Sequence, residues 1–171
     1  MKTISRHYYK TDYAEFVICS FEDKICMLDY RYRKKRDAVD RRIAKGLDGT
    51  FVEQESAVIV QMKVELDAYF RQERQTFSVP ILMVGTAFQK EVWQALLEIP
   101  YGQTSSYGVL SQKMGKPKAV RAVANANGAN AMSIIIPCHR IIGSDGSLTG
   151  YAGGLAVKRH LLELENSLFC V

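Results

Sequence analysis

The chemistry that this sequence could carry is concentrated in residues 134–141, Ile-Ile-Ile-Pro-Cys-His-Arg-Ile. The three isoleucines predict a buried strand, and Pro137, which has no N–H to donate, should end that strand and begin a turn. Cys138 and His139 then follow side by side. A cysteine reacts as its thiolate, and a neighbouring imidazole is one of the few groups that can populate the thiolate near neutral pH. Alternatively, Cys138 is simply a small buried hydrophobic residue, and the octapeptide alone leaves both interpretations open.

The composition is that of an ordinary globular protein. The chain has 171 residues, enough for one or two domains, of which 47% are hydrophobic and 24% are charged. No apolar stretch approaches the roughly 20 residues of a membrane span, and residues 1–7 contain no apolar signal region, so we expect a cytoplasmic protein. The formal net charge of +5 favours an anionic partner and permits nucleic acid without proving it.

The cysteines are widely scattered, at Cys19, Cys26, Cys138 and Cys170, with no Cys-x-x-Cys pair. This pattern favours reduced thiols over a disulfide framework or a zinc site. Cys19 and Cys26 fall on a predicted hairpin and are interpreted as packing residues. His7 and these two cysteines could be imagined as metal ligands, but their spacing matches no common site and a fourth ligand is missing. We therefore expect no metal and no cofactor.

The first half, residues 1–80, is predicted to be an α/β domain with a small sheet and helices. The predicted elements are the hairpin strands Tyr13–Phe21 and Ile25–Tyr32, a helix over Asp37–Lys45 that ends at Gly46, a short strand Thr50–Val52, a helix over 55–73, and a strand or linker over Thr76–Pro80. The interior of the second helix, Val60 and Val64 included, is densely apolar and should pack across the sheet. The basic run Arg33–Arg36 could contact phosphate, but such a run is more often the solvated start of a helix.

The second half, residues 81–171, is predicted to be mostly helical. Its expected helices are 87–98, with Thr86 as N-cap, 105–114, closed by Gly115, 117–127, with Pro117 at its first position, and 154–165. A short helix, a tight glycine turn and a second helix form the helix-turn-helix pattern. Trp93, on the first of these helices, is most simply a core residue.

The helix predicted over 117–127 has a face from which bulky side chains are missing, made by Ala119, Ala122 and Ala126. Such a face allows a close helix–helix contact, or the close approach of the backbone to another surface. Arg121 favours the second alternative, because a lone arginine on a small-residue helix can enter a groove, whereas a packed face would not tolerate it.

Over residues 80–168 the chain closely resembles the methylated-DNA–protein cysteine methyltransferases, also called O6-alkylguanine-DNA alkyltransferases. Several motifs match together and in order, which makes a chance similarity very improbable. They are Gly85-Thr86 with Phe88-Gln89 and Val92-Trp93, Ile99–Thr104 with Ser106-Tyr107-Gly108, Arg121–Ala124 with Asn127 and Asn130, Ile136–Ile141, and Gly150-Tyr151 with Gly153-Gly154-Leu155. The first half is compatible with the small α/β domain of this family, although its own signal is weak.

The resemblance implies a ribonuclease-H-like first domain and a winged-helix-like second domain that binds DNA. It implies repair by direct reversal, in which an alkyl group on O6 of guanine, and also on O4 of thymine, moves irreversibly to Cys138. One protein molecule would thus repair one lesion, without a cofactor. The implied partner is double-stranded DNA that carries O6-alkylguanine, bound by a monomer near the nucleoid, with cooperative binding along DNA left open.

The same resemblance assigns roles to individual residues. Cys138 would be the nucleophile and His139 the base that takes its proton, while Glu165 would orient the imidazole and balance its charge. Without the resemblance, Glu165 would be interpreted as a solvated residue at a helix end.

Two further residues would support the leaving group and one would brace the nucleophile. Tyr107 would donate its phenol proton to the guanine ring as the oxygen leaves, which neutralises charge that develops in the transition state. Lys158 would lie beside this tyrosine and tune it, although an ordinary surface lysine is the alternative. Asn130 would hold the segment before the cysteine by hydrogen bonds.

The resemblance also implies how DNA is held. The damaged base would leave the duplex, because a buried thiol cannot reach a stacked base. Arg121 would fill the gap, and the helix with Ala119, Ala122 and Ala126 would lie in the minor groove together with Tyr107. The flipped base would meet a pocket formed by Tyr151, Ala152, Ile141 and Trp93. Ala131 and Ser133 stand where prolines are frequent and Ala152 where serine is frequent, which should loosen the pocket wall.

Two functions from other classes were weighed against this one. A lesion sensor on the same fold would transfer nothing, but such relatives lack the cysteine that is present here as Cys138. A cysteine hydrolase on an unrelated fold would need an oxyanion hole and access for water, and only the Cys-His pair points toward it. A regulator fused to a zinc-binding module is excluded because the four-cysteine module is absent.

Overall fold

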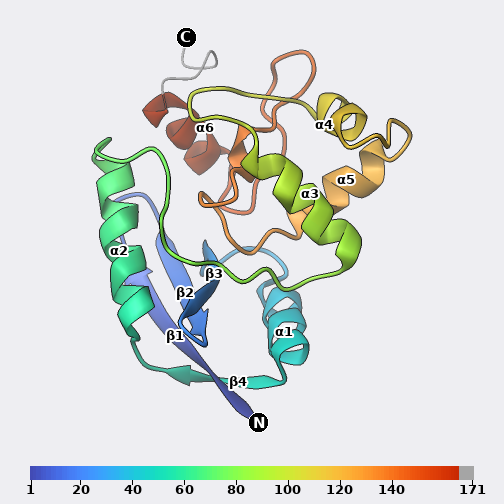
Figure 1. Cartoon of the computed structure of the whole chain (residues 1–171). Helices are drawn as coiled ribbons and strands as arrows, with labels where there is room; N and C mark the ends of the chain where they lie inside the picture. The colour runs from blue at the N-terminus through green and yellow to red at the C-terminus, as the bar shows by residue number, and fades with distance from the viewer. Residues whose placement is uncertain (166–171) are drawn as a thin grey trace. The chain divides into compact units, whose positions relative to one another are not determined.

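The computed structural model describes residues 1–165, so Cys170 lies outside the described residues. The chain forms two compact units, one over Met1–Gly85 and one that begins at Thr86. Figure 1 labels the helices and strands of both units. The expected architecture, a small sheet with helices followed by a mostly helical domain, is confirmed.

The first unit is built on a four-stranded mixed sheet with the order β3-β2-β1-β4. β2 (Glu15–Phe21) and β3 (Lys24–Tyr30) form the predicted antiparallel hairpin, and the predicted short strand is β4 (Gly49–Glu53). β1 (Lys2–Lys10) pairs antiparallel with β2 and parallel with β4. β1 was not predicted, because its residues are mostly polar and give no apolar alternation.

Two helices complete the first unit, and both correct details of the prediction. α1 (Arg36–Leu47) runs through Gly46 and ends at Asp48, which adopts a left-handed conformation. A Cβ on Gly46 would lie 2.5 Å from Val84, so this glycine permits a close approach and does not end the helix. α2 (Ala57–Phe70) packs on β2 and β3. Val64 is nevertheless 62% exposed and Val60 is also exposed, because only one face of α2 can contact the sheet.

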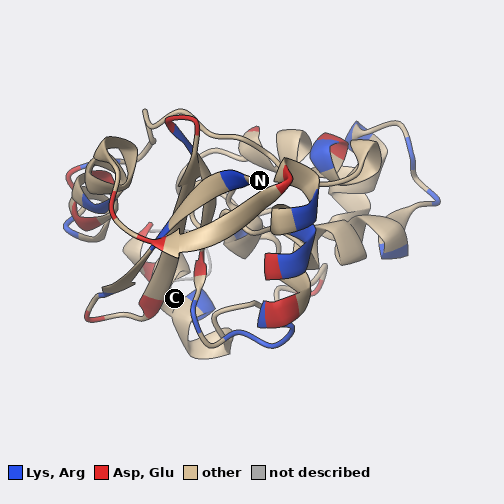
Figure 2. Cartoon of the chain, turned by 90° about the horizontal axis from the view of Figure 1, so that it is seen from below, with Lys and Arg blue, Asp and Glu red and all other residues tan. Residues whose placement is uncertain are grey.

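Two arginines of the basic run before α1 form ion pairs inside the first unit. Asp29, at the end of β3, is fully buried, and its carboxylate accepts hydrogen bonds from Arg33 and Arg36, each at 3.1 Å. Arg36 also pairs with Asp40 at 3.0 Å. Figure 2 shows this basic segment as a blue stretch that leads into α1. The arginines of the run therefore neutralise a buried carboxylate, which weakens the case for a phosphate contact there.

The second unit contains four α-helices in its described part: α3 (Ala87–Leu97), α4 (Tyr107–Lys113), α5 (Val120–Gly128) and α6 (Leu155–Leu164). Thr86 caps α3 as predicted and forms a capping box with Gln89. α5 begins three residues later than expected. Pro117 belongs to a turn closed by the Ala119 N–H and the Lys116 carbonyl at 2.9 Å, where proline is favoured, and not to the helix.

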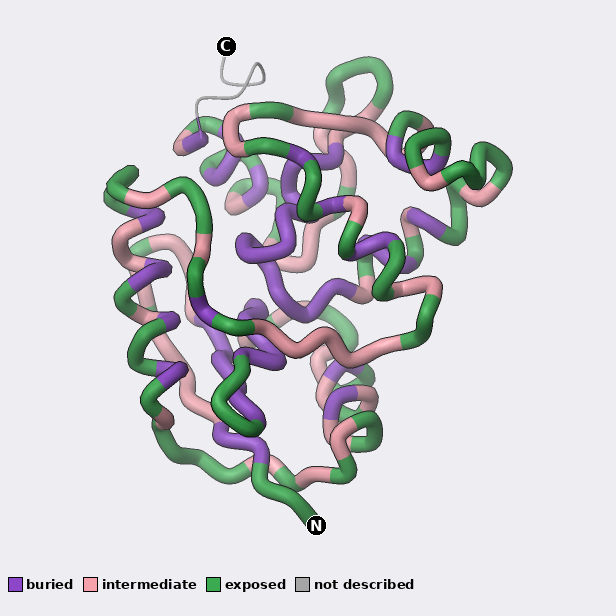
Figure 3. Tube along the Cα trace, in the orientation of Figure 1, coloured by how far each residue is buried: buried purple, intermediate pink, exposed green. Residues whose placement is uncertain are grey.

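The isoleucine run is not a strand, contrary to the prediction. Ile134 and Ile135 form a turn, Ile134 has a φ of 73°, and the Ile136 N–H donates to the Met132 carbonyl at 2.9 Å. All residues from 130 to 141 are buried, as the purple stretch in Figure 3 indicates. Apolar residues thus signalled burial correctly, but a short apolar run does not determine whether the backbone is extended or turned.

Among residues 1–165, no helix has the length and apolar character that a bilayer crossing requires.

The Asp29 cluster yields a test of the packing of the first unit. We expect Asp29→Asn to lower the free energy of unfolding by about 3–5 kcal/mol, because it leaves two arginines near an uncharged buried group. Asp40→Asn, which removes a partly exposed partner of Arg36, should cost less than about 1 kcal/mol. Urea unfolding of the two variants measures both values, and equal losses would contradict the buried role of Asp29.

Candidate active site

The backbone that carries the cysteine is braced by a buried asparagine. Asn130 Nδ2 donates to the Ile136 carbonyl at 3.0 Å and lies 3.2 Å from Cys138 Sγ, while its Oδ1 accepts from the Met132 N–H at 2.9 Å. One side chain thus bonds to both arms of the isoleucine turn and to the sulfur. Because β-branched residues are strained at positive φ, these bonds explain how Ile134 is held in its conformation.

Cys138, His139 and Arg140 form a single turn of 3-10 helix, and all three are buried. Glu165, at the C-terminal end of α6, faces this turn. Its Oε2 lies 2.8 Å from His139 Nε2, and Arg140 donates to both of its oxygens, with Nε at 2.8 Å and an Nη at 3.0 Å. Glu165 is only 1% exposed, so it is not the solvated helix-end residue of the alternative interpretation.

This arrangement determines the charge and tautomer of the imidazole. Burial lowers the pKa of His139, and although the Glu165 hydrogen bond and charge raise it, the net direction is down. Burial raises the pKa of Glu165, but the charges and hydrogen bonds of His139 and Arg140 outweigh that effect and lower it to about 2. A neutral imidazole beside a carboxylate must donate from Nε2. Its Nδ1 then carries a lone pair, and that atom has no hydrogen-bond partner among the described residues.

A second cation lies near the sulfur. Lys158 on α6 is 1% exposed, and its Nζ donates to the Thr149 carbonyl and hydroxyl, both at 3.3 Å. Burial lowers the pKa of Lys158 from 10.5 to about 8, opposed by the charge of Cys138. By reciprocity, the ammonium of Lys158 favours the thiolate form of Cys138. Lys158 is therefore not the ordinary surface lysine of the alternative interpretation.

Tyr107 is the first residue of α4 and lies within electrostatic reach of the sulfur. Its hydroxyl oxygen accepts from Asn127 Nδ2 at 3.0 Å. Burial raises the pKa of Tyr107, the charge of Cys138 adds to this, and hydrogen bonds with Asn127 and Thr149 oppose it. Cys138 is therefore surrounded by the groups that were predicted to form one site with it: the imidazole of His139, the carboxylate of Glu165, Lys158 and the phenol of Tyr107.

Other predicted residues lie in different environments. Tyr151 and Ala152 are partly exposed, and the Tyr151 ring lies edge-on to that of His139, with 6.5 Å between centroids. The Ile141 side chain is fully buried, and Trp93 is buried with its Nε1–H on the Ala126 carbonyl at 2.9 Å. Trp93 is thus a core residue, as its apolar helical spacing suggested, and its place in a pocket wall stays a prediction.

The small-residue face of α5 is only partly exposed. Arg121 and Ala122 are exposed and Ala119 is half-buried, whereas Ala126 is 3% exposed because it packs beneath α3. The close helix–helix contact is therefore present on the side of Ala126, whose burial argues against a contact with DNA. The approach of the exposed side, with Ala119 and Ala122, to another surface stays a prediction.

Three site residues were given no role by the sequence analysis. Arg140 holds Glu165 and donates from an Nη to the Ile99 carbonyl at 2.6 Å. Asn127 and Thr149 contact the Tyr107 hydroxyl. Arg140 could have been found from its place in the Cys-His-Arg motif, and Asn127 was part of a matched motif. Thr149 carried no signal.

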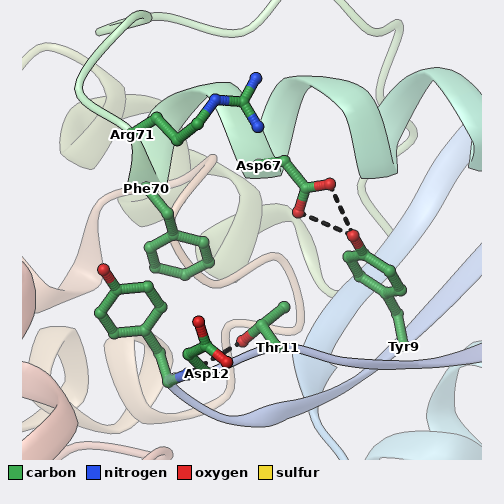
Figure 4. A pocket seen from close by; sticks show the side chains of 7 residues that line it. Tyr9, Thr11, Asp12, Asp67, Phe70 and Arg71 are labelled. Atoms are coloured by element: carbon green, nitrogen blue, oxygen red, sulfur yellow. Dashed lines mark hydrogen bonds between the residues drawn. The ribbon is translucent and has the colours of Figure 1, made fainter.

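No candidate metal site accompanies this cluster in residues 1–165. No group of three or more His, Cys, Asp or Glu side chains there could hold a metal ion. His7 pairs with Glu55 at 3.1 Å, and in the sheet it lies opposite Ile18 while Cys19 lies opposite Arg6. A hollow in the first unit is drawn in Figure 4. It is lined by residues without a thiol or an imidazole: Tyr9, Thr11, Asp12, Tyr13, Asp67, Phe70 and Arg71.

Comparisons with known proteins cover both units. The profile of the "6-O-methylguanine DNA methyltransferase, DNA binding domain" family matches residues 87–167, and that of the corresponding "ribonuclease-like domain" matches residues 4–83. A methylated-DNA–protein-cysteine methyltransferase from Haemophilus influenzae is 42% identical over 159 residues, which span 92% of this chain and 84% of that protein.

A second relative and a solved structure give the same assignment. The Methanosarcina acetivorans methylated-DNA–protein-cysteine methyltransferase is 54% identical over 103 residues, 60% of this chain and 66% of that protein, so slightly less than two thirds of it is spanned. A crystal structure of Mycobacterium tuberculosis OGT in complex with DNA superposes with a TM-score of 0.80 at 36% identity, covering 95% of this chain and 92% of that one. With matches over both units and the cysteine site in place, the chain belongs to the methylated-DNA–protein-cysteine methyltransferase family.

Proposed function

We propose that this protein repairs alkylated DNA by accepting the alkyl group from O6 of guanine on Cys138, once and irreversibly. The observation that carries the proposal is the position of Cys138 Sγ. The sulfur is held by Asn130 at 3.2 Å on a buried turn whose next residue, His139, is bonded to Glu165. A thiolate is a strong nucleophile toward carbon, and a site that excludes water keeps that thiolate poorly solvated and therefore reactive.

The nucleophile is prepared by the loss of its proton. His139 Nε2 is bonded to Glu165, so its Nδ1 is the nitrogen that remains to accept the cysteine proton. As the imidazolium forms, the carboxylate of Glu165 stabilises it, and the nearby ammonium of Lys158 stabilises the thiolate. Arg140 would serve as a positioning residue that keeps Glu165 ionised and oriented.

Transfer then forms one bond and breaks one. The sulfur attacks the alkyl carbon, the S–C bond forms, and the C–O6 bond breaks with its electron pair moving into the guanine ring. Tyr107 would supply a proton to a ring nitrogen, so that guanine leaves as a neutral base. The thioether formed on Cys138 has no proton to lose and does not revert, which makes the protein a stoichiometric reagent. The same step would act on O4 of alkylated thymine.

The DNA-binding surface would be the helix-turn-helix of α4 and α5. The sequence contains no acidic residue between Glu98 and Asp145, and four exposed cations lie in this interval: Lys113, Lys116, Lys118 and Arg121. Figure 2 shows blue without red in the turn between α4 and α5, at its right. Such a surface suits a phosphate backbone. The DNA complex of the Mycobacterium tuberculosis relative supports the same partner here.

Reaching the lesion requires that the base leave the duplex. Cys138 is buried, and a thiol in that position cannot reach a base that remains stacked. The exposed Arg121, on the part of α5 where Ala119 and Ala122 leave room, would occupy the gap. Tyr151 and Ala152 are partly exposed near the site and would contact the extruded base.

The central prediction concerns stoichiometry. Incubation with duplex DNA that contains O6-methylguanine should add one methyl group per protein molecule, on Cys138, because the thioether cannot be recycled. Intact-mass and peptide mass spectrometry measure this, and Cys138→Ser should bind the same DNA but gain no mass. Repeated turnover, or a protein of unchanged mass, would refute the proposed function.

A second prediction distinguishes stabilisation of the Cys138 thiolate by Lys158 from a contribution of Lys158 to the stability of the fold. Lys158→Met should slow methyl transfer by about tenfold or more, because loss of the nearby ammonium disfavours the thiolate of Cys138. Its melting temperature should stay the same or rise, because a buried charge is replaced by an apolar chain. Arg159→Met removes an exposed charge from the same helix and should transfer at the normal rate. A variant with normal transfer at position 158 would exclude this role.

A third prediction concerns Arg121. Arg121→Ala should slow transfer from duplex DNA by at least about tenfold, because the few kcal/mol of base flipping would no longer be offset. Reaction with the free base O6-benzylguanine should be unaffected, since that substrate needs no flipping. Lys90→Ala, an exposed change on α3, serves as control. An equal loss on both substrates would show that Arg121 acts on the chemistry or the fold instead.

A further inference from the structure

The phenol of Tyr107 is contacted by side chains whose part in the proposed reaction has not been assigned. Asn127, on α5, is 8% exposed and donates from Nδ2 to the Tyr107 oxygen at 3.0 Å. The Thr149 side chain also hydrogen-bonds with Tyr107, and the Thr149 hydroxyl accepts from Lys158. The phenol oxygen is therefore anchored from two elements, α5 and the loop before α6.

The direction of these bonds matters for a proton donor. A phenol has one proton and an oxygen that can accept two hydrogen bonds. When Asn127 donates to that oxygen, the phenol proton stays available for another acceptor. Donation to the oxygen also stabilises the phenolate, which is why Asn127 and Thr149 lower the pKa of Tyr107 against the larger effect of burial.

Asn127 is also costly for the fold. Its Oδ1 is buried and has no hydrogen-bond partner among the described residues. An unsatisfied buried acceptor destabilises a protein, whereas an apolar residue of similar volume would leave none. The packing between α4 and α5 therefore does not by itself explain an asparagine here, but a function at the Tyr107 hydroxyl does.

We propose that Asn127 is a positioning residue for proton donation by Tyr107: its amide holds the phenol oxygen so that the phenol proton faces the extruded base. This inference rests on the proposed alkyl transfer. As the proton moves to the ring nitrogen, negative charge develops on the phenol oxygen, and the bond from Asn127 strengthens. Stabilisation that grows toward the transition state accelerates the chemical step without tightening DNA binding.

The test is a double-mutant cycle between the two residues. Single-turnover methyl transfer from O6-methylguanine duplex is measured for the unmodified protein, Asn127→Leu, Tyr107→Phe and the double variant. Asn127→Leu should slow transfer by about tenfold to a hundredfold, the range for a hydrogen bond to a charged group. The double variant should be no slower than Tyr107→Phe, because without a phenol the amide has nothing to position.

Three further measurements separate positioning from damage to the fold. The melting temperature of Asn127→Leu should be unchanged or raised, since the unsatisfied acceptor is gone. Its affinity for lesion DNA should be unchanged, as should the rate at which iodoacetamide alkylates Cys138, because Asn127 acts on the leaving group and not on the sulfur. A fall in any of these would assign the lost transfer to structure and overturn the inference.

The remaining outcomes are distinguishable. If the unmodified protein accepts no methyl group, the proposed function itself fails. Suppose instead that the unmodified protein accepts the methyl group. If Asn127→Leu then transfers at the same rate, the role of Asn127 is refuted while alkyl transfer stands. The same conclusion holds if Asn127→Leu slows transfer by an equal factor in the presence and in the absence of the Tyr107 hydroxyl.

Discussion

The buried carboxylate of Glu165 is the group on which the rest of the site depends. It joins α6 to the turn of Cys138 by bonds to His139 and Arg140. A lone carboxylate at 1% exposure would be strongly destabilising, and the guanidinium of Arg140 compensates it. Because Arg140 supplies the positive charge, His139 can remain neutral. A neutral imidazole with its N–H on Glu165 has a lone pair free for a proton, so structural and chemical requirements are met by the same three side chains.

In the proposed reaction, the groups that prepare the nucleophile differ from those that prepare the leaving group. His139 and Lys158 would act on the sulfur of Cys138, whereas Tyr107, positioned by Asn127, would act on the departing base. Lys158 connects the two sets, because its ammonium affects Cys138 and its hydrogen bond reaches Thr149. Burial is common to all of them. In a medium of low dielectric these few charges act strongly on one another, and each must therefore be placed accurately.

The first unit follows the same physical rule. Asp29 is buried and is matched by Arg33 and Arg36, so that a run of basic residues becomes internal compensation. In the second unit, by contrast, the exposed cations near α5 lie in a segment without any carboxylate. Basic residues are thus used in two different ways along the chain. Of these cations, Lys116 pairs with Glu91 of α3 at 3.7 Å, and both side chains of this pair are exposed. Exposed cations in a region poor in acidic residues are suited to hold an anionic polymer.

The sequence by itself determined the helices of the second half, the hairpin of the first, the Thr86 cap and the adjacency of Cys138 and His139. These depend on local spacing, on capping chemistry and on chain order, which a sequence displays directly. Predictions from local spacing were wrong where the tertiary environment determines the conformation or the burial of a residue. Strand β1 gained its partners from β2 and β4, Val64 proved exposed, and the isoleucine run became a turn.

Only the tertiary structure decided which side chains meet. Glu165 reaches His139 across 26 positions of sequence, and Asn127 reaches Tyr107 across 20. It also assigned Ala126 and Trp93 to the core, although the resemblance implied a DNA contact for the first and a pocket wall for the second. Burial and pairing between distant residues depend on how the elements pack, and no local pattern encodes that packing. The sequence therefore pointed to the sulfur of Cys138, and the tertiary structure determined which side chains surround it.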